Sequence, residues 1–248
     1  MGWKWASGGD FVSFTPTATS TATNYDVDRM SLIGAHPYIR GWRSTVVTET
    51  DIVCDIGIDT AITHLVLLNI NVASIDLHWK SASGNYAAVA GSPFTVSQRR
   101  PGPFYHIIVD AAVTARYIRI RFNNATARTD NAAYYRLGAL VIIDDMNTLT
   151  QHPLAGMRGQ LDRDYIRSGQ DISAVGPFRL TYNYNLNVKN ANVNEMYEIA
   201  ELGEETPVLI YENEGSNQDV GLFRYEGGFP FTRNSLTVEM TPRFVEMA

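Results

Sequence analysis

The sequence has little cysteine and no long apolar run. Cys54 is the single cysteine among 248 residues, so the chain cannot form an internal disulfide. It lies in the apolar stretch 51–57, which predicts a buried thiol and folding in a reducing cytosol. No stretch of about 18 apolar residues occurs, and residues 1–14 lack the apolar segment of a signal peptide. We therefore expect no membrane span and no export by the general secretory route.

A run of basic residues is also missing. The 20 basic and 26 acidic residues give a net charge of −6, and the largest basic cluster lies at residues 98–100. A nucleic-acid-binding surface needs a basic stripe or patch, so nucleic acid is not an expected partner. With 45% hydrophobic residues, the chain is long enough for two ordinary domains and needs no metal in order to fold.

Catalytic motifs are absent as well. There is no nucleophile elbow, phosphate loop or dinucleotide fingerprint. The five histidines (36, 64, 78, 106 and 152) lack zinc-site spacing, and those at 64, 78 and 106 are expected to face solvent from strands. The glutamates between 195 and 205 fit a solvated helix face better than the carboxylate pair of a glycosidase. The chain is therefore predicted not to be an enzyme and to need no cofactor, with one structural calcium as an alternative.

Segments with strand character recur from Asp51 to residue 145. They are rich in β-branched residues or alternate in polarity, and they cover 51–58, 62–72, 74–82, 93–98, 104–111, 115–123 and 138–145. In one of them Ile75, Leu77 and Trp79 share a face. Short strands at regular spacing predict a β-sandwich over 24–150, preceded by a Thr- and Ala-rich arm or linker at 1–23.

The composition changes near 145–160, where polar residues, a proline and two glycines predict a domain boundary. Beyond it, residues 178–188 alternate as one strand, and residues 193–202 carry a helical stripe that ends before Gly203. Further strands follow from Pro207. We therefore expect a small β domain with one short helix at 151–248.

The tryptophans are the main candidates for a binding surface. Trp79 is expected in the core, whereas Trp42 could stack on a sugar or plug the base of the sandwich, with the plug favoured. Trp3 and Trp5 lie near the N-terminus and are expected to dock against a neighbouring chain. The candidate ligand or partner surface comprises Trp3, Trp5, Trp42, Ser83 and Asn85, the last two from a polar turn.

Four pieces of residues 36–124 resemble the discoidin or coagulation-factor type of galactose-binding-like domain. They are Trp-Arg-Ser at 42–44, Asp-Ile-Gly at 55–57, the strand 62–68 and Ala-Arg-Tyr-Ile-Arg-Ile-Arg-Phe at 115–122. The resemblance implies a jelly-roll-like sandwich whose loops at one end meet sugars, lipids or proteins. The expected fold class is thus all-β, a galactose-binding-like β-sandwich followed by the small β domain.

The order of elements also resembles a group of bacteriophage virion proteins, through residues 207–211, 221–231 and 235–240. This resemblance implies a structural protein of the tail tip or baseplate, assembled in the host bacterial cytoplasm and located in the virion. Its partners would be other tail proteins and copies of itself, in a trimer or hexamer. The alternative is a carbohydrate-binding module or adhesin that recognises a host surface glycan; a glycan-degrading enzyme lacks a catalytic pair.

Overall fold

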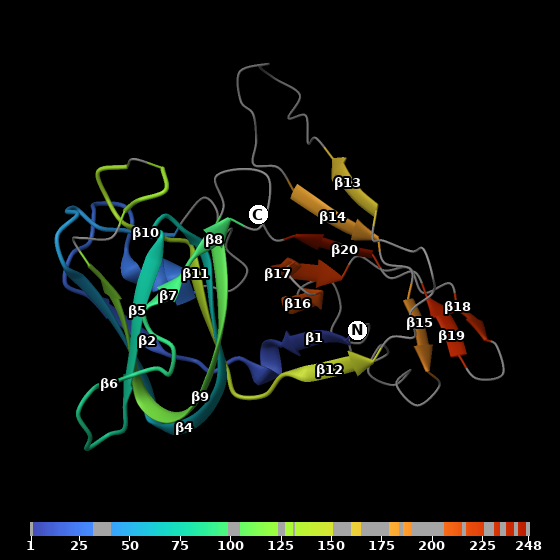
Figure 1. Ribbon diagram of the computed structural model, residues 1–248, viewed down its shortest axis with the longest axis horizontal. Coiled ribbons are helices and arrows are strands. Elements are labelled where there is room, and N and C mark those ends of the chain that lie inside the picture. The colour runs from blue at the N-terminus through green and yellow to red at the C-terminus, as the bar shows by residue number, and fades with distance from the viewer. Residues whose placement is uncertain are drawn as a thin grey trace, which may run out of the picture. The chain divides into compact units, whose positions relative to one another are not determined.

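The computed structural model describes residues 2–31, 41–98, 105–123, 127–130, 132–150, 160–164, 179–183, 186–189, 206–214, 217–225, 231–233, 237–240 and 243–246 (Figure 1). The chain forms two compact units. One, called the sandwich unit below, is Asp10–Met146; the other, the second unit, combines Met1–Gly9 with Asn147–Ala248.

The sandwich unit is built on one antiparallel eight-stranded sheet. Its path runs β11-β4-β9-β5-β6, while β2 pairs with β4, β7 with β5 and β8 with β9. The strands are β2 (Thr15–Ala18), β4 (Thr50–Ile70), β5 (Ser74–Lys80), β6 (Ala87–Ala88), β7 (Phe94–Thr95), β8 (Ser97–Gln98), β9 (Tyr105–Phe122) and β11 (Ala139–Ile143). A separate two-stranded ribbon joins β3 (Trp42–Arg43) to β10 (Arg136–Leu137), and a short 3-10 helix, η2, spans Val27–Ser31.

The two longest strands, β4 and β9, fold the sheet back on itself (Figure 1). Residues 50–55 of β4 pair with 117–122 of β9, and residues 60–70 pair with 105–115, with a register shift between the two stretches. At the bend, Gly57 has φ of 91° and Ala112 has φ of 46°. Glycine adopts this backbone region without strain, which suits residue 57 to a sharp turn inside a strand. A single long hairpin thereby contributes to both layers of the sandwich.

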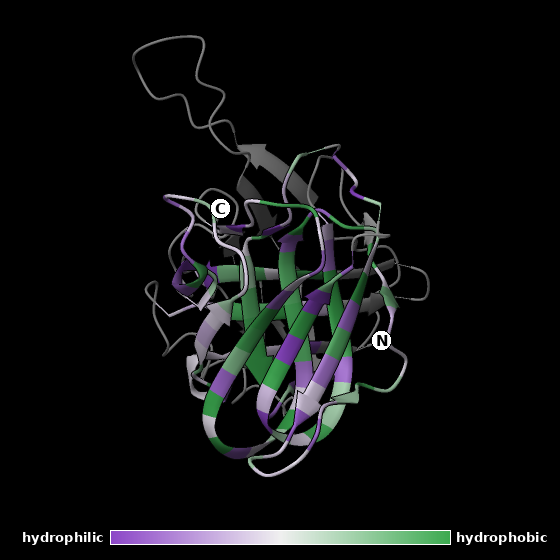
Figure 2. Cartoon of the chain, turned by 90° about the vertical axis from the view of Figure 1, so that its left-hand side faces the viewer, coloured by the Kyte–Doolittle hydropathy of each residue, from purple (hydrophilic) through white to green (hydrophobic). Residues whose placement is uncertain are grey.

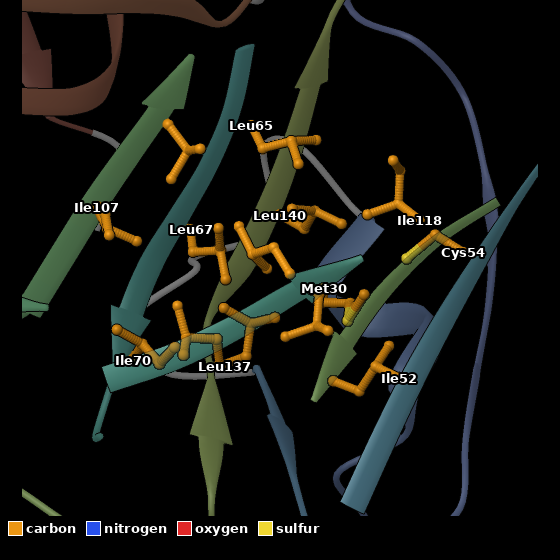
Figure 3. Packing of buried hydrophobic residues seen from close by; sticks show 14 of the residues in the cluster. Met30, Ile52, Cys54, Leu65, Leu67, Ile70, Ile107, Ile118, Leu137 and Leu140 are labelled. Carbon is orange, nitrogen blue, oxygen red and sulfur yellow. The ribbon is translucent and has the colours of Figure 1, made fainter. Parts of the chain in front are cut away.

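The core lies between these two layers (Figure 3). The first layer contributes Ile52, Cys54 and Ile118, and the second contributes Leu65 and Leu140, all with 0% of their surface exposed. Polar and apolar residues alternate along the strands, as Figure 2 shows. Alternation places one face in the core and the other in solvent, because successive strand side chains point to opposite sides.

The sandwich confirms several sequence predictions. The Cys54 thiol is buried, Ile75 and Leu77 are buried, and Trp79 packs against the same core. The predicted all-β fold class with a β-sandwich is confirmed. Predicted strands 51–58 and 62–72 are in fact one strand, β4, because its bulges let the chain bend without leaving the ladder.

The second unit contains a seven-stranded sheet in the order β12-β1-β16-β17-β20-β14-β13 and a three-stranded sheet in the order β15-β19-β18. The strands are β1 (Gly2–Ser7), β12 (Asn147–Thr150), β13 (Gln160–Asp164), β14 (Arg179–Asn183), β15 (Leu186–Lys189), β16 (Val208–Glu214), β17 (Asn217–Tyr225), β18 (Phe231–Arg233), β19 (Thr237–Met240) and β20 (Arg243–Glu246); the 3-10 helix η1 spans Gly8–Asp10.

The N-terminal segment 1–23 is not the separate arm that the sequence predicts. Strand β1 pairs with β12 and β16, so the first residues belong to the second unit. Strand β2 pairs with β4 and belongs to the sandwich. The sequence signal failed here because strand pairing over some 200 residues leaves no local pattern. The division at 146/147 differs in the same way from the predicted ranges 24–150 and 151–248.

Two further expectations concern the second unit. The single strand expected at 178–188 is divided between two sheets, as β14 and β15. The helix expected at 193–202 lies outside the described residues. In the part of the chain that the structure describes, no helix is both long and apolar enough to cross a membrane.

Candidate functional site

Trp42 is fully buried and plugs the end of the sandwich where β4 ends. Its ring centroid lies 5.3 Å from that of Phe122, which in turn stacks on Tyr135 at 5.0 Å. The indole Nε1 donates a hydrogen bond to the carbonyl oxygen of Ser20 at 3.0 Å. With 0% of its surface exposed, Trp42 cannot serve as a sugar platform, and the plug interpretation is confirmed.

The buried Trp42 fixes the neighbouring Arg43, which is half-exposed. The Arg43 guanidinium carbon lies 4.0 Å from the ring centroid of Tyr25 and 4.8 Å from that of Tyr134. Both rings are half-exposed, and within the described residues Arg43 has no carboxylate partner. Cation–π contacts restrain the guanidinium while leaving its N–H groups available.

Asn71, at the end of β4, holds the loop that carries Tyr134. Its Nδ2 donates to Asp130 Oδ1 at 3.1 Å and to the Tyr134 carbonyl at 3.0 Å, and its Oδ1 accepts the Arg136 backbone N–H at 2.7 Å. Asn71 is fully buried, and Arg136 forms an ion pair with Asp130 at 3.4 Å. A buried amide with all these bonds satisfied fixes the positions of Asp130, Tyr134 and Arg136 relative to the end of β4.

Polar atoms without partners accompany this arrangement. Arg128 Nε, Arg136 Nε and Thr129 Oγ1 are buried and have no hydrogen-bond partner among the described residues. We call Tyr25, Arg43, Asp130, Tyr134 and Arg136 the loop-end cluster. It offers two aromatic rings, an available guanidinium and a carboxylate on a rigid frame, which is the mixture that a polar ligand with one apolar face requires.

A second group of side chains lies on the outer face of the first layer. It comprises His78 and Lys80 from β5, Tyr86 from the following turn, and Tyr117 and Arg119 from β9, and we call it the sheet-face patch. Lys80 Nζ lies 4.5 Å from the Tyr117 ring centroid and 5.1 Å from that of Tyr86, and the Arg119 guanidinium carbon lies 4.2 Å from the Tyr86 ring. The strand register places His78 opposite Arg119 and Lys80 opposite Tyr117.

Two paired arginines flank the sheet-face patch. Arg121 donates to both oxygens of Asp51, at 2.8 and 2.9 Å, and Arg116 donates to both oxygens of Asp55, at 3.0 and 3.2 Å. Two hydrogen bonds lower the pKa of Asp55 below its ordinary value: the one from Arg116 has the larger effect, and the one from the Gly57 backbone N–H comes next. Asp55 is therefore ionised at neutral pH. The arginines that bind Asp51 and Asp55 compensate the charges of both carboxylates.

His78 is the titratable member of the patch. Its burial, and next the positive charges of Arg119 and Arg121, lower its pKa below the ordinary value of 6.5. The imidazole is therefore neutral at pH 7, and its Nδ1 is buried with no hydrogen-bond partner in the described part of the chain. A neutral imidazole has one N–H and one acceptor nitrogen.

Within the sandwich unit, the structure does not bring the sequence-predicted site residues Trp42, Ser83 and Asn85 together. Ser83 and Asn85 are exposed in the turn after β5, which lies beside the β4 bend because the Ala82 N–H donates to Asp59 Oδ1 at 2.9 Å. Trp42 lies at the opposite end of the sandwich. Trp3 and Trp5 belong to β1 in the second unit, and Trp5 is buried at 3% exposure, so its docking partner is its own chain.

Two of the histidines expected to face solvent are buried. His106, at 1% exposure, accepts the Asn69 backbone N–H through Nδ1 at 3.0 Å. Asn69 has φ of 54° and lies in a register shift of β4, so the imidazole takes the place of a ladder partner for its N–H. His64, at 7% exposure, lies 2.9 Å from Asp110 through Nε2. The prediction was wrong for both because ladder irregularities cannot be read from alternation.

Local patterns carry a usable signal for only part of these sites. Alternation in 74–82 and 115–122 places Lys80, Tyr117 and Arg119 on an outward face. Tyr25 and Tyr134 carry no local signal and meet Arg43 only through the fold.

Metal ligands do not gather in the described part of the chain, where no three His, Cys, Asp or Glu side chains lie close enough to hold an ion. The glutamates at 195–205 lie outside the described residues. A structural calcium therefore stays a prediction.

Comparison with known protein families finds no match, and comparison with curated proteins finds none either. Several solved structures resemble about half of the chain. Chitosan-binding module 1 of a chitosanase/glucanase from Paenibacillus sp. IK-5 is 20% identical, with 52% of this chain and 93% of that chain covered and a TM-score of 0.40. The module CpGH89CBM32-4 of Clostridium perfringens, in complex with GlcNAc-alpha-1,4-galactose, is 10% identical, with 54% and 90% covered and a TM-score of 0.42.

Reduced XRCC1 bound to the DNA polymerase beta catalytic domain is likewise 10% identical, with 54% of this chain and 99% of that chain covered and a TM-score of 0.44. At such levels of identity and overlap, these likenesses say nothing about which ligand this chain binds.

Proposed function

We propose that the sandwich unit is a non-enzymatic carbohydrate-binding module and that the loop-end cluster holds the sugar. The observation that carries this proposal is the position of the Arg43 guanidinium between the half-exposed rings of Tyr25 and Tyr134. A sugar presents apolar C–H faces and a rim of hydroxyls. Aromatic rings suit the former, and guanidinium and carboxylate groups suit the latter.

The residues that hold the loop-end cluster in place reduce the entropy that is lost on binding. Trp42 anchors one strand of the cluster in the core, and Asn71 fixes the loop that supplies Asp130 and Tyr134. Side chains that are already ordered lose little entropy when a ligand arrives. A single shallow site of this kind corresponds to a Kd from about micromolar to about millimolar.

The test is an NMR titration of the protein with a broad panel of oligosaccharides, followed by Kd measurement for those that bind. Arg43→Ala and Tyr134→Ala should each weaken binding about tenfold or more, since each removes a direct contact. Arg116→Ala is the matched control, because it removes a guanidinium at the other end of the sandwich. If no oligosaccharide shifts the resonances of residues 25, 43 and 134, the proposal fails.

A second candidate role is assembly into a bacteriophage tail, in a homo-oligomer or with other tail proteins. The observation in its favour is the seven-stranded sheet of the second unit, whose end strands β12 and β13 each have one neighbour among the described strands. Such edges accept a strand from another chain. Light scattering and negative-stain imaging of the purified protein should then show trimers, hexamers or rings. A monomer at all concentrations would contradict self-assembly.

A further inference from the structure

The sheet-face patch carries positive charge that no carboxylate among the described residues neutralises. Within the described residues Lys80 and Arg119 contact the rings of Tyr86 and Tyr117 but no carboxylate. Their neighbours Arg116 and Arg121, by contrast, each pair with an aspartate. The two arginines of β9 that flank Arg119 are therefore neutralised, and Arg119 is not.

Two buried nitrogen atoms of the patch also lack partners. Arg119 Nε and His78 Nδ1 have no hydrogen bond to the described residues, and they belong to residues directly opposite each other on β9 and β5. Buried polar atoms are normally satisfied, so these two nitrogens leave unused hydrogen-bonding capacity within the patch. An oxygen-rich anion would accept from the Arg119 guanidinium.

The tyrosine rings hold the cations in position before any ligand arrives. Lys80 lies over both rings and Arg119 over Tyr86, so neither side chain is free to sample all its rotamers. Binding an anion to restrained cations costs less side-chain entropy than binding it to mobile ones.

The surrounding carboxylates decide what kind of anion fits. Asp55 neutralises Arg116 toward the β4 bend, and Asp51 neutralises Arg121 toward the other end of the first layer, so the positive charge left over is confined to Lys80 and Arg119. A polyanion such as a nucleic acid needs a longer run of unpaired cations for its successive phosphates. A neutral chain with an isolated negative charge needs only this short area, and the planar guanidinium matches the two oxygens of a carboxylate.

We infer that the sheet-face patch is a second binding site, specific for a carboxylate-bearing sugar such as a uronic acid residue of a glycan. The carboxylate accepts hydrogen bonds from Arg119 and Lys80. The inference rests on the proposed function in taking the ligands of this unit to be glycans, but it concerns different residues from the loop-end cluster.

The experiment compares a uronic acid oligosaccharide with its carboxyl-reduced neutral counterpart, which has the same backbone without the charge. The acidic form should bind about tenfold more tightly, and Lys80→Ala or Arg119→Gln should each remove about that factor. Resonances of His78 should shift with the acidic form alone. Raising the salt from about 0.05 M to about 0.5 M should weaken binding, because the contact is with half-exposed charges.

Arg29→Ala, which removes a positive charge from η2 outside both sites, is the control for net charge. Lys80→Ala should leave the fold intact, because the Lys80 side chain is half-exposed and forms no hydrogen bond or ion pair with the described residues. This variant tests the inference if Arg119→Gln does not fold. Equal affinity for the acidic and reduced forms, unaffected by Lys80→Ala, would overturn the inference even if the loop-end cluster binds sugar. Binding of single-stranded DNA or anionic vesicles in preference to the oligosaccharide would also overturn it.

The inference is supported if Lys80→Ala loses the extra affinity for the acidic oligosaccharide while Arg43→Ala binds that oligosaccharide as tightly as the wild type. This outcome would support it even if no neutral sugar binds at the loop-end cluster. The two proposals can thus fail separately.

Discussion

Asp51 and Arg121 face each other across the paired strands β4 and β9, and two parallel hydrogen bonds of 2.8 and 2.9 Å join them. Their side chains are 19% and 29% exposed, so solvent screens the pair only in part. A planar guanidinium matches both oxygens of a carboxylate, which an ammonium cannot do. We therefore predict that Arg121→Lys destabilises the protein although it keeps the charge.

A double-mutant cycle with Asp51→Asn and Arg121→Lys should give a coupling energy of about 1 kcal/mol by urea denaturation. The Asp55–Arg116 pair is the internal control, since its side chains are 36% and 33% exposed and its coupling should be smaller. Equal coupling energies for both pairs would show that the exposure of the side chains does not determine the strength of these arginine–aspartate pairs.

The burial of Trp5 leads to a prediction about the N-terminal strand. Trp5 is 3% exposed within the chain, and β1 lies between β12 and β16. Trp5→Ala should lower the free energy of unfolding of the isolated protein by about 3 kcal/mol, because it removes a large buried side chain and leaves a cavity. Lys4→Ala, in the same strand and half-buried, should have a small effect. An unchanged unfolding midpoint for Trp5→Ala would mean that β1 docks elsewhere.

The limits of the sandwich can be tested with fragments. Residues 10–146 include β2, the Val12 N–H bond to the Ile142 carbonyl at 2.9 Å and the Ser20 carbonyl that Trp42 needs. A fragment 24–150 lacks all three. The first fragment should unfold cooperatively at a temperature several degrees higher than the second, as measured by circular dichroism. Equal midpoints would show that residues 10–23 do not stabilise the sandwich.

The sandwich could be predicted from the sequence because alternation is a local signal. Ile118 and Ile120 are buried while Arg119 and Arg121 point outward, as the sequence at 115–122 indicates. The bend of β4 could not be predicted in the same way. The sequence predicts two separate strands at 51–58 and 62–72, whereas the ladder continues through the bend.

Of the residues that form or support the loop-end cluster, the sequence pointed only to Trp42. The Trp-Arg-Ser sequence drew attention to Trp42, which proves to be the buried anchor, while the neighbouring Arg43 faces the rings of Tyr25 and Tyr134. Those tyrosines lie 18 residues before and 91 residues after Arg43 in the sequence. Contacts at such separations depend on the whole fold and leave no spacing to recognise.

The anchor and the ligand contact can be separated by mutation. Trp42→Phe removes the hydrogen bond to Ser20 and part of the ring, and should cost about 1–3 kcal/mol of stability. Arg43→Ala should change stability little, because the half-exposed guanidinium has no carboxylate partner among the described residues, but it should weaken sugar binding. Urea denaturation and an oligosaccharide titration measure the two effects. A large loss of stability in Arg43→Ala would make the Tyr25–Arg43–Tyr134 contact structural.

His78 should make stability depend on pH between neutrality and mild acid. Its folded-state pKa lies below the unfolded value of 6.5, so at mildly acidic pH the unfolded chain binds the proton more readily than the folded one. The stability that the neutral His78 side chain contributes is fully present above pH 6.5. It falls as the pH drops below 6.5 and stops falling below the folded-state pKa of His78. The groups around His78 are Arg119 and Arg121, which lower its pKa, and Asp76 and Asp51, which raise it by a smaller amount.

His78→Gln should therefore lose less stability than the wild type between about pH 7.5 and about pH 5, as measured by urea denaturation at both values. Arg119→Gln should reduce the same pH dependence, because it removes the nearer positive charge that disfavours the imidazolium. A carboxylate-bearing sugar at the sheet-face patch should act in the same direction, since a negative charge beside His78 stabilises its protonated form. If His78 titrates at or above 6.5 in the free protein, the two arginines do not act on it as described.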